Sequence, residues 1–225
     1  MPGRELLPCV EIEPRGEASS SIVWLHGLGA SGHDFEPIVP HLGLPRTRFV
    51  FPHAPQRAVT INMGLIMPAW YDITGLTAAT FGAPERHVRE SADMVEVLLE
   101  RERARGVPAS RTVLAGFSQG GAVAIFAGLR HAESLAGILA LSAHDLLPET
   151  REAEMSPANT ATAMLFCHGT YDPVVPVELG RAAYEACATA GRDARWLEFP
   201  IEHQVSMEEV KEVGAWLRER LELAP

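Results

Sequence analysis

The sequence predicts an α/β protein whose doubly wound, mostly parallel sheet carries helices on both faces. Short apolar runs alternate along the chain with segments of helical periodicity, which is the pattern of such a sheet. Several of these runs are apolar throughout, as strands buried on both faces should be. The 225 residues contain no internal repeat and no low-complexity linker, so we expect residues 1–225 to form a single domain.

Six apolar runs are the predicted strands of the parallel sheet. They are, in chain order, Ser21–His26, Arg48–Pro52, Arg111–Gly116, Leu135–Leu141, Ala161–His168 and Ala194–Phe199. A further segment, Cys9–Glu13, precedes them and is expected to add an antiparallel strand at one edge of the sheet.

Four segments have helical patterns. Pro84–Arg105 starts with a proline at a suitable first helical position and repeats apolar residues on one face. Gln119–Arg130 and Val177–Ala190 are two more. Ser206–Leu221 begins with a serine and, three residues later, a glutamate, which is the spacing of a capping box.

The composition limits the partners and the compartment. A formal net charge of −10 argues against a nucleic-acid partner, which needs a basic face, and offers little attraction to an anionic membrane surface. The three cysteines are few, odd in number and without C-x-x-C spacing, which is typical of a reducing compartment. The N-terminal residues lack an apolar core, so we expect no signal peptide and a cytoplasmic protein.

One uncharged run, Thr112–Leu129, is long enough for a membrane span, but its centre reads Gly-Phe-Ser-Gln-Gly-Gly, so we expect no membrane insertion. The same centre contains Gly116-x-Ser118-x-Gly120, the pattern of a nucleophilic serine at a strand-to-helix turn. A predicted strand runs into Ser118 and a predicted helix leaves it, so the serine has the context that this chemistry needs. The alternative is an ordinary turn of small residues.

A serine hydroxyl is a weak nucleophile near neutral pH and needs a histidine base that a carboxylate orients. In a doubly wound sheet these groups lie after strands, in the chain order serine, acid, histidine. Four histidines follow Ser118 in the chain: His131, His144, His168 and His203. Among them His203 lies between the last predicted strand and the last predicted helix, where the base is expected.

Asp172 directly follows the strand Ala161–His168 and is the predicted acid. Asp145, after the preceding strand, is its competitor, whereas Asp193 lies at the amino end of a strand. The alternative is that Asp172 only forms a turn before Pro173 and that the histidine is an ordinary loop residue.

Two backbone amides are the predicted donors to the developing oxyanion. Gln119 follows the nucleophile, and Leu28 lies in the glycine-rich loop HGLGASGHDF that follows an early strand. The alternative is a loop that merely turns the chain. His26 and His33 belong to the same loop, but no H-E-x-x-H or comparable ligand set accompanies them, so we expect no metal site.

These blocks together resemble the carboxylesterase and acyl-protein thioesterase family of α/β-hydrolases. The resemblance rests on HGLGASGHDF, on PHAPQRAVTINMGLIMPAWYD (52–72), on GFSQGG, and on HGTYDPVVP followed by His203; it covers the chain from about residue 20 onward. It implies an α/β-hydrolase fold and the same nucleophile, base, acid and oxyanion donors as above. It also implies no cofactor, and the habit of the family suggests a homodimer.

The segment Ala58–Asp72 is uncharged over fourteen residues yet too irregular for a strand or a helix. The resemblance implies that it lines an acyl-binding groove, because a soft thioether and a flat ring accommodate an aliphatic chain. The candidate lining residues are Leu65, Ile66, Met67 and Trp70. The alternative is that these side chains only fill the core.

The sequence departs from the family pattern at three places. Ala30 and Ser31 stand where relatives often carry an acid. Ala143 and His144 stand where many relatives have a glycine and an aromatic residue, and Glu202 replaces the glycine usual before the catalytic histidine. None of these changes removes a predicted member of the serine, acid and histidine set, so they bear on specificity.

The sequence therefore predicts a serine hydrolase that cleaves small-molecule esters of short- to medium-chain acids, and thioesters, through an acyl-enzyme on Ser118. A long-chain lysophospholipase or acyl-protein thioesterase is the alternative within the same chemistry. The alternative from another class is a non-catalytic binding protein of the same fold. Labelling of the serine by a fluorophosphonate separates an enzyme from a binding protein.

Overall fold

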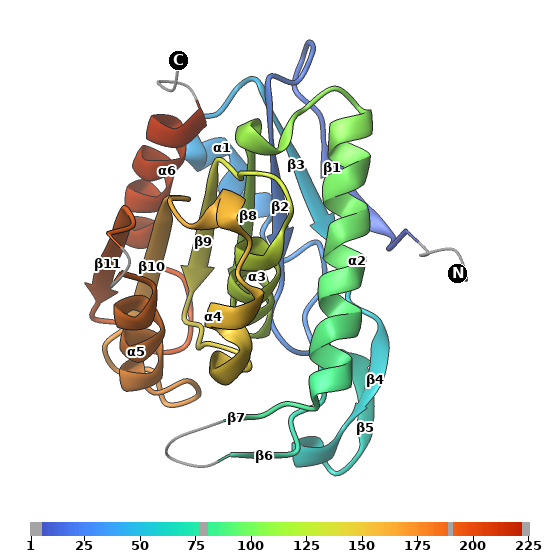
Figure 1. Cartoon of the computed structure of the whole chain (residues 1–225), viewed down its shortest axis with the longest axis vertical. Coiled ribbons are helices and arrows are strands. Elements are labelled where there is room, and N and C mark those ends of the chain that lie inside the picture. The colour runs from blue at the N-terminus through green and yellow to red at the C-terminus, as the bar shows by residue number, and fades with distance from the viewer. Residues whose placement is uncertain (1–5, 77–80, 189–190, 222–225) are drawn as a thin grey trace.

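The computed structural model describes residues 6–76, 81–188 and 191–221. Its centre is a seven-stranded sheet in the order β1-β3-β2-β8-β9-β10-β11 (Figure 1). The strands are β1 (Cys9–Ile12), β2 (Ser20–Leu25), β3 (Thr47–Pro52), β8 (Thr112–Phe117), β9 (Gly137–Leu141), β10 (Met164–Gly169) and β11 (Ala194–Phe199). β1 pairs antiparallel with β3, and the other neighbouring strands of this sheet are parallel. The predicted sheet, with its antiparallel edge, is confirmed.

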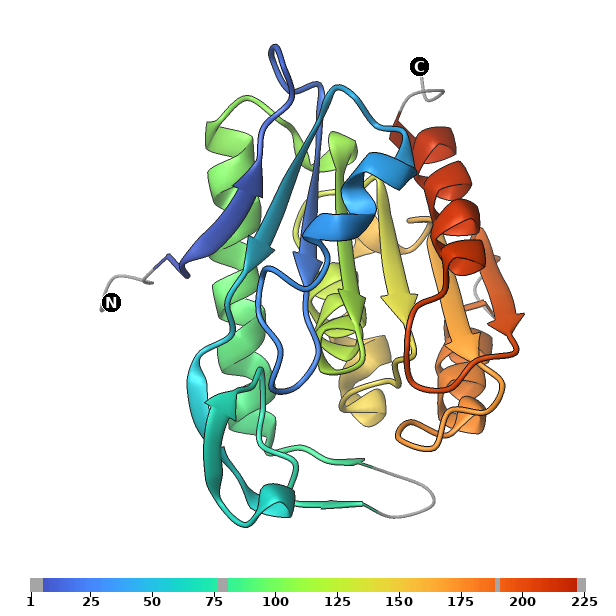
Figure 2. The same ribbon diagram turned by 180° about the vertical axis from the view of Figure 1, so that it is seen from behind.

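Helices cover both faces of the sheet. α2, α3, α4 and α5 lie on one face, and α1 and α6 lie on the other (Figures 1 and 2). The bounds are α1 (Val39–Leu42), α2 (Glu85–Ala104), α3 (Gln119–Arg130), α4 (Arg151–Glu154), α5 (Val177–Ala188) and α6 (Met207–Leu221). Each face has its own core: Val95 and Val123 lie in one, and Leu42 and Val213 lie in the other. The doubly wound architecture is confirmed.

The helix ends follow the local signals in part: Pro84, predicted as the first helical residue, is instead the N-cap of α2. The Ser206 hydroxyl accepts the N–H of Glu209 at 3.1 Å, which is one half of the predicted capping box. The Glu209 carboxyl is buried, with the residue 1% exposed, and the backbone of Ser206 is the neighbour that favours its ionised form. The predicted helix Val177–Ala190 is observed to Ala188, and its last two positions lie outside the described residues.

The uncharged run Thr112–Leu129 is divided between β8 and α3, so it does not form one continuous helix. Across the described part of the chain, no helix combines the length and the apolar character needed to cross a membrane.

Two hairpins connect β3 to α2 at the end of the molecule toward which the parallel strands point (Figure 2). They pair β4 (Gln56–Val59) with β5 (Leu65–Pro68), and β6 (Gly75–Leu76) with β7 (Phe81–Gly82). The expectation that this region contains no strand is therefore wrong. Met63 and Gly64 take positive φ values of 57° and 75°, which reverse the chain and let the two strands pair.

Candidate active site

Ser118 lies at the turn between β8 and α3, with φ of 54° and ψ of −121°. This conformation is outside the helical and strand regions and is strained for a residue with a side chain. The crossing is tight: a Cβ on Gly116 would lie 2.3 Å from the backbone of Gly120, and a Cβ on Gly120 would lie 2.3 Å from the carbonyl oxygen of Leu25. The flanking glycines of the motif are therefore required by the close approach of three backbone segments.

His203 connects Ser118 to Asp172. Its Nε2 lies 2.9 Å from Ser118 Oγ, and its Nδ1 lies 2.7 Å from Asp172 Oδ2. Because a carboxylate can only accept, Nδ1–H donates to Asp172, which leaves Nε2 to accept the serine proton. These residues come together because β8, β10 and β11 are parallel and end at one edge of the sheet. The Phe117 ring packs against the imidazole, with 4.8 Å between ring centroids, and restricts its rotation.

Three donors hold the Asp172 carboxylate. Oδ1 accepts the N–H groups of Val174 and Val175, both at 2.9 Å, and Oδ2 accepts from His203. Burial alone favours the neutral acid, but the hydrogen bonds from His203 and from these two amides outweigh burial and lower the pKa of Asp172 below its ordinary value. The group is therefore a carboxylate at any pH at which a neutral histidine can act as a base.

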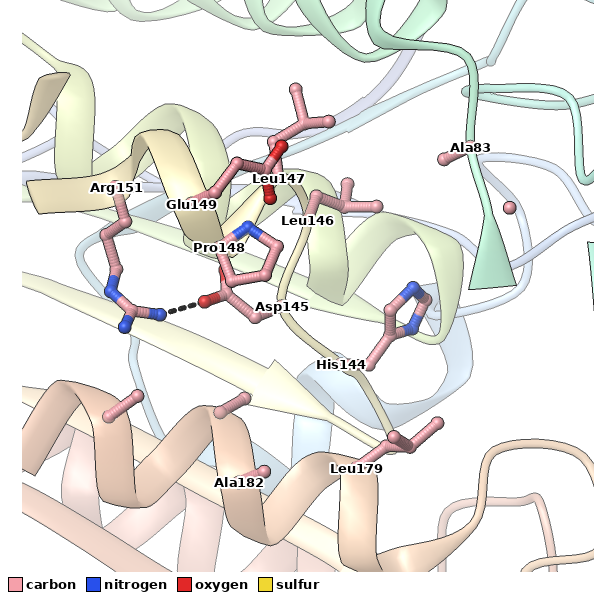
Figure 3. Close-up of a pocket in the computed structure, with 13 residues that line it drawn as sticks. Ala83, His144, Asp145, Leu146, Leu147, Pro148, Glu149, Arg151, Leu179 and Ala182 are labelled. Atoms are coloured by element: carbon pink, nitrogen blue, oxygen red, sulfur yellow. Dashed lines mark hydrogen bonds and ion pairs between the residues drawn. The ribbon is translucent and has the colours of Figure 1, made fainter. Parts of the chain in front are cut away.

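Asp145, the competing acid of the sequence, lies in a different environment. Its carboxylate is paired with the Arg151 guanidinium and lines another pocket (Figure 3). Burial raises the pKa of Asp145, and the guanidinium groups of Arg151 and Arg130 reduce that rise without cancelling it. The structure thus places Asp172, and not Asp145, against the histidine.

A pocket of about 320 Å³ opens beside Ser118 and His203, within the size range of small-molecule sites. Apolar side chains form much of its wall. The other lining residues are Gly27, Leu28, Ala30, Asp34, Ile61, Tyr71, Ile73, Phe117, Gln119, His144, Val174 and Val175. This wall suits an uncharged group with an aliphatic part.

The two predicted oxyanion donors, Leu28 and Gln119, both line this pocket. Gln119 is the first residue of α3, so its N–H has no acceptor within the helix. The loop that carries Leu28 approaches the serine closely, since a Cβ on Gly27 would lie 3.4 Å from Ser118 Cβ. Both amides therefore belong to residues that adjoin the nucleophile.

Trp70 does not line this pocket, and its contact with an acyl chain stays a prediction. The residue is fully buried. Its indole N–H donates to the carbonyl oxygen of His26 at 2.8 Å, and its backbone N–H donates to Gln119 Oε1 at 3.0 Å. These bonds use its polar groups inside the core, where it supports the two segments that carry the oxyanion candidates.

Leu65, Ile66 and Met67 also lie outside the lining of this pocket, and their contact with an acyl chain stays a prediction. Leu65 and Ile66 are 62% and 68% exposed on β5. Met67 is half-buried, and its sulfur lies 3.7 Å from the position of a Cβ on Gly29. These residues belong to β5, which pairs with β4 in a hairpin and not with a strand of the central sheet.

The apolar wall could not be predicted from the sequence and comes from two segments of the chain. Tyr71 and Ile73 lie within three residues after Trp70, and Val174 and Val175 lie within three residues after Asp172. Proximity in the chain was the signal available. The direction of each side chain depends on backbone turns that the sequence pattern does not reveal.

The departures from the family pattern lie at different places relative to the serine. Ala30 and His144 line the pocket, whereas Glu202 is exposed to solvent.

His26, which was considered as a metal ligand, accepts the N–H of Ala54 with its Nε2 at 3.0 Å, so this nitrogen is engaged by the backbone. Among the residues that the structure describes, no three histidine, cysteine, aspartate or glutamate side chains are grouped to hold a metal ion.

The family model described as phospholipase/carboxylesterase matches residues 8–221. The chain belongs to this family. It is 35% identical over 214 residues to acyl-protein thioesterase 1 of Gibberella zeae, with 90% of this chain and 91% of that protein covered. It is 31% identical over 221 residues to acyl-protein thioesterase 1 of Yarrowia lipolytica, with 95% and 97% covered.

Among solved structures, the crystal structure of esterase PE8 superposes with a TM-score of 0.84 at 29% identity, covering 96% of this chain and all of that one. The fold is thus the α/β-hydrolase fold. Family membership, together with the contacts among Ser118, His203 and Asp172, makes the chain a serine hydrolase of the esterase and thioesterase kind.

Proposed function

We propose that this serine hydrolase cleaves small-molecule carboxylic esters of short- to medium-chain acids, and thioesters of the same acids, through an acyl-enzyme on Ser118. The observation that carries the proposal is the position of the His203 imidazole, which contacts the Ser118 hydroxyl at 2.9 Å and the Asp172 carboxylate at 2.7 Å. Both distances are within the reach that proton transfer requires.

The proposed reaction has two steps. His203 Nε2 takes the proton of Ser118 as Oγ attacks the carbonyl carbon, and the imidazolium gives that proton to the leaving alcohol or thiol as its bond to the carbonyl carbon breaks. A water then gives a proton to the same imidazole and attacks the acyl-enzyme, which releases the acid and restores the serine. Asp172 holds the tautomer with the proton on Nδ1 and stabilises the imidazolium. No cofactor takes part in these steps.

The carbonyl oxygen becomes negatively charged in both tetrahedral intermediates, and the amides of Leu28 and Gln119 are its proposed donors. Gln119 adds the positive end of the α3 dipole, because it is the first residue of that helix. Its side chain is engaged with the backbone of Trp70 and Tyr71, so the amide N–H is the group left to face the substrate.

The proposal is tested by hydrolysis of p-nitrophenyl esters from acetate to palmitate, with Ser118→Ala as the blank. We expect turnover that is highest at short to medium chains and falls about 10⁶-fold in kcat in the variant. A fluorophosphonate should label the wild type at Ser118 and leave the variant unlabelled. A folded wild type that neither labels nor turns over any ester would favour the non-catalytic binding protein.

A second candidate is an acyl-protein thioesterase, and the names of the two relatives above favour it. The discriminating measurement compares release of octanoate and palmitate from an S-acylated peptide with release from the matched O-ester. A preference for the S-palmitoyl peptide would replace the small-molecule assignment. A homodimer remains a prediction, which light scattering after size-exclusion chromatography would check.

A further inference from the structure

A second pocket, of about 470 Å³, lies between the segment that follows β9 and the helix α5 (Figure 3). It is larger than the pocket beside Ser118. Its lining residues are Gly82, Ala83, His144, Asp145, Leu146, Leu147, Pro148, Glu149, Arg151, Leu179, Ala182, Ala183 and Ala186. Neither the proposed chemistry nor the predicted groove makes use of this space.

His144 belongs to both pockets. Within the described part of the chain, it is the one residue that lines the second pocket and also the pocket that holds Ser118. It lies three residues past the end of β9 and is 7% exposed. Figure 3 shows its ring at one end of the second pocket and Arg151 at the other, with the Leu146–Pro148 segment along one side and α5 along the other. The two pockets therefore adjoin at this imidazole.

The wall beyond His144 suits an aliphatic chain. Leu146, Leu179 and Ala183 provide apolar contacts. Of the charged lining residues, Asp145 and Arg151 neutralise each other in an ion pair, and Glu149 is exposed to solvent. The imidazole itself is uncharged at neutral pH, since burial, with a smaller contribution from the neighbouring His168, lowers its pKa to about 4. A neutral ring between two largely apolar spaces is a steric boundary and not a site for an ion.

We propose that the His144 side chain is a partition that limits the length of the aliphatic chain accepted beside Ser118, and that the second pocket is the space it withholds. The inference rests on the proposed function, because it concerns the substrate of the same serine. The aliphatic chain of the substrate belongs either to the acyl group or to the alcohol of the ester, and two series of substrates distinguish these two cases.

Removing the partition has a quantitative consequence. Each methylene moved from water into an apolar wall improves binding about fourfold. The value of kcat/KM should therefore rise by about this factor for each methylene added to the substrate, until the available space is filled. In the wild type the rise should stop when the pocket of about 320 Å³ is full. Without the ring it should continue into the second pocket, which more than doubles the space.

The experiment measures kcat/KM for p-nitrophenyl esters of acids with two to sixteen carbons, and for acetate esters of alcohols over the same lengths. The variants are His144→Ala, which opens the partition, and His144→Phe, which keeps a ring there. The double variant His144→Ala with Ala182→Phe refills the second pocket from an exposed position on α5. His41→Ala, an exposed histidine on α1, is the matched control.

We expect His144→Ala to raise the ratio of long-chain to short-chain kcat/KM at least tenfold in one of the two series, which identifies the chain concerned. His144→Phe should keep the wild-type ratio, and adding Ala182→Phe should return the opened variant toward it. If His144→Ala does not fold, as judged by its melting curve, His144→Val removes part of the ring and should shift the ratio in the same direction.

Superimposable length profiles for the wild type and the folded opening variant, in both series, would overturn the inference. A wild type that hydrolyses palmitate esters as efficiently as butyrate esters would also overturn it. Failure of the proposed function is distinguishable, because it would show as loss of fluorophosphonate labelling and of acetate ester turnover in the wild type itself.

Discussion

Asp145 lies four residues past the end of β9, and Asp172 lies three residues past the end of β10, the neighbouring parallel strand. Asp172 is buried and Asp145 is half-buried, and both lie at the same edge of the same sheet. Asp145 is paired with Arg151, and its pKa is raised by burial. Asp172 accepts three hydrogen bonds, and its pKa is lowered despite burial.

The difference shows that position after a strand does not by itself make an acid useful to a histidine. In Asp172 the following turn, with Val174 and Val175, directs two backbone amides at one carboxylate oxygen and leaves the other free for His203. Asp145 has a longer-range partner on α4 instead. Local backbone geometry, and not the strand, separates the two roles.

The largest expected effect comes from Asp172→Asn. An amide cannot hold the Nδ1–H tautomer of His203 as a carboxylate does, so kcat for the acetate ester should fall about 10⁴-fold with little change in KM. The measurement is steady-state hydrolysis alongside circular dichroism. A loss in kcat of less than tenfold in a folded variant would show that Asp172 is not the acid on which His203 depends.

Glu209 extends the comparison to a third carboxyl, which is almost completely buried and has only the Ser206 backbone to offset that burial among the causes of its pKa shift. Burial raises its pKa from 4.5 to about 7. The folded protein thus binds this proton more tightly than the unfolded chain, and stability should fall by about 3 kcal/mol as pH rises from 4.5 to about 7, then stay constant.

Glu209→Gln keeps the shape of the side chain and removes the titration. Urea denaturation at pH 5 and pH 8 should therefore show that the pH dependence of stability in this range is reduced in the variant. Glu208→Gln, an exposed neighbour on the same helix, is the control and should behave as the wild type. Equal slopes for Glu209→Gln and the wild type would contradict the prediction.

Asp145→Asn should affect stability more than catalysis. It breaks the pair with Arg151 and leaves a partly buried guanidinium unpaired, at a cost of about 2 kcal/mol in the free energy of unfolding. The kcat/KM for the acetate ester should change by less than tenfold. A loss of turnover as large as that of Asp172→Asn would show that the structure had assigned the two aspartates to the wrong roles.

The smallest expected effect is confined to acid pH, where the two aspartates should act with opposite sign. The contribution of Asp172 to the free energy of unfolding is present above its ordinary pKa of 3.8. It is lost as the pH falls through the lower pKa of the folded protein. The raised pKa of Asp145 makes its contribution fall as pH rises from 3.8 through the folded value.

Lowering the pH from 6 to 3 should therefore shrink the stability advantage of the wild type over Asp172→Asn and enlarge its advantage over Asp145→Asn. Urea titrations at several pH values measure both differences. The same sign of change in the two variants would show that one of the two environments is misassigned.

The sheet and the group around Ser118 could be predicted because both depend on regular features. Apolar runs give the strands, and parallel strands place the residues that follow them at one edge, so the order of Ser118, Asp172 and His203 was enough to place them together. The wall of the pocket could not be predicted in this way. The polar groups of Trp70 form hydrogen bonds with His26 and Gln119, which lie in distant segments of the sequence.

The boundary between the two pockets was equally hidden. His144 adjoins both because the segment after β9 packs against α5, which is a contact between elements and leaves no pattern in the sequence. Glu209 shows the same limit, since its capping-box spacing gave no sign that its carboxyl would turn into the core.

The order of the three site residues has a consequence for biosynthesis. A ribosome delivers Ser118 first, Asp172 later and His203 last, and the last of these follows β11, the far edge strand of the sheet. A growing chain therefore contains Ser118 before it contains His203, and it cannot carry out the proposed hydrolysis until both are present and folded. Covalent capture of the serine by a fluorophosphonate would accordingly serve as a clock for the completion of the fold on chains stalled at successive lengths.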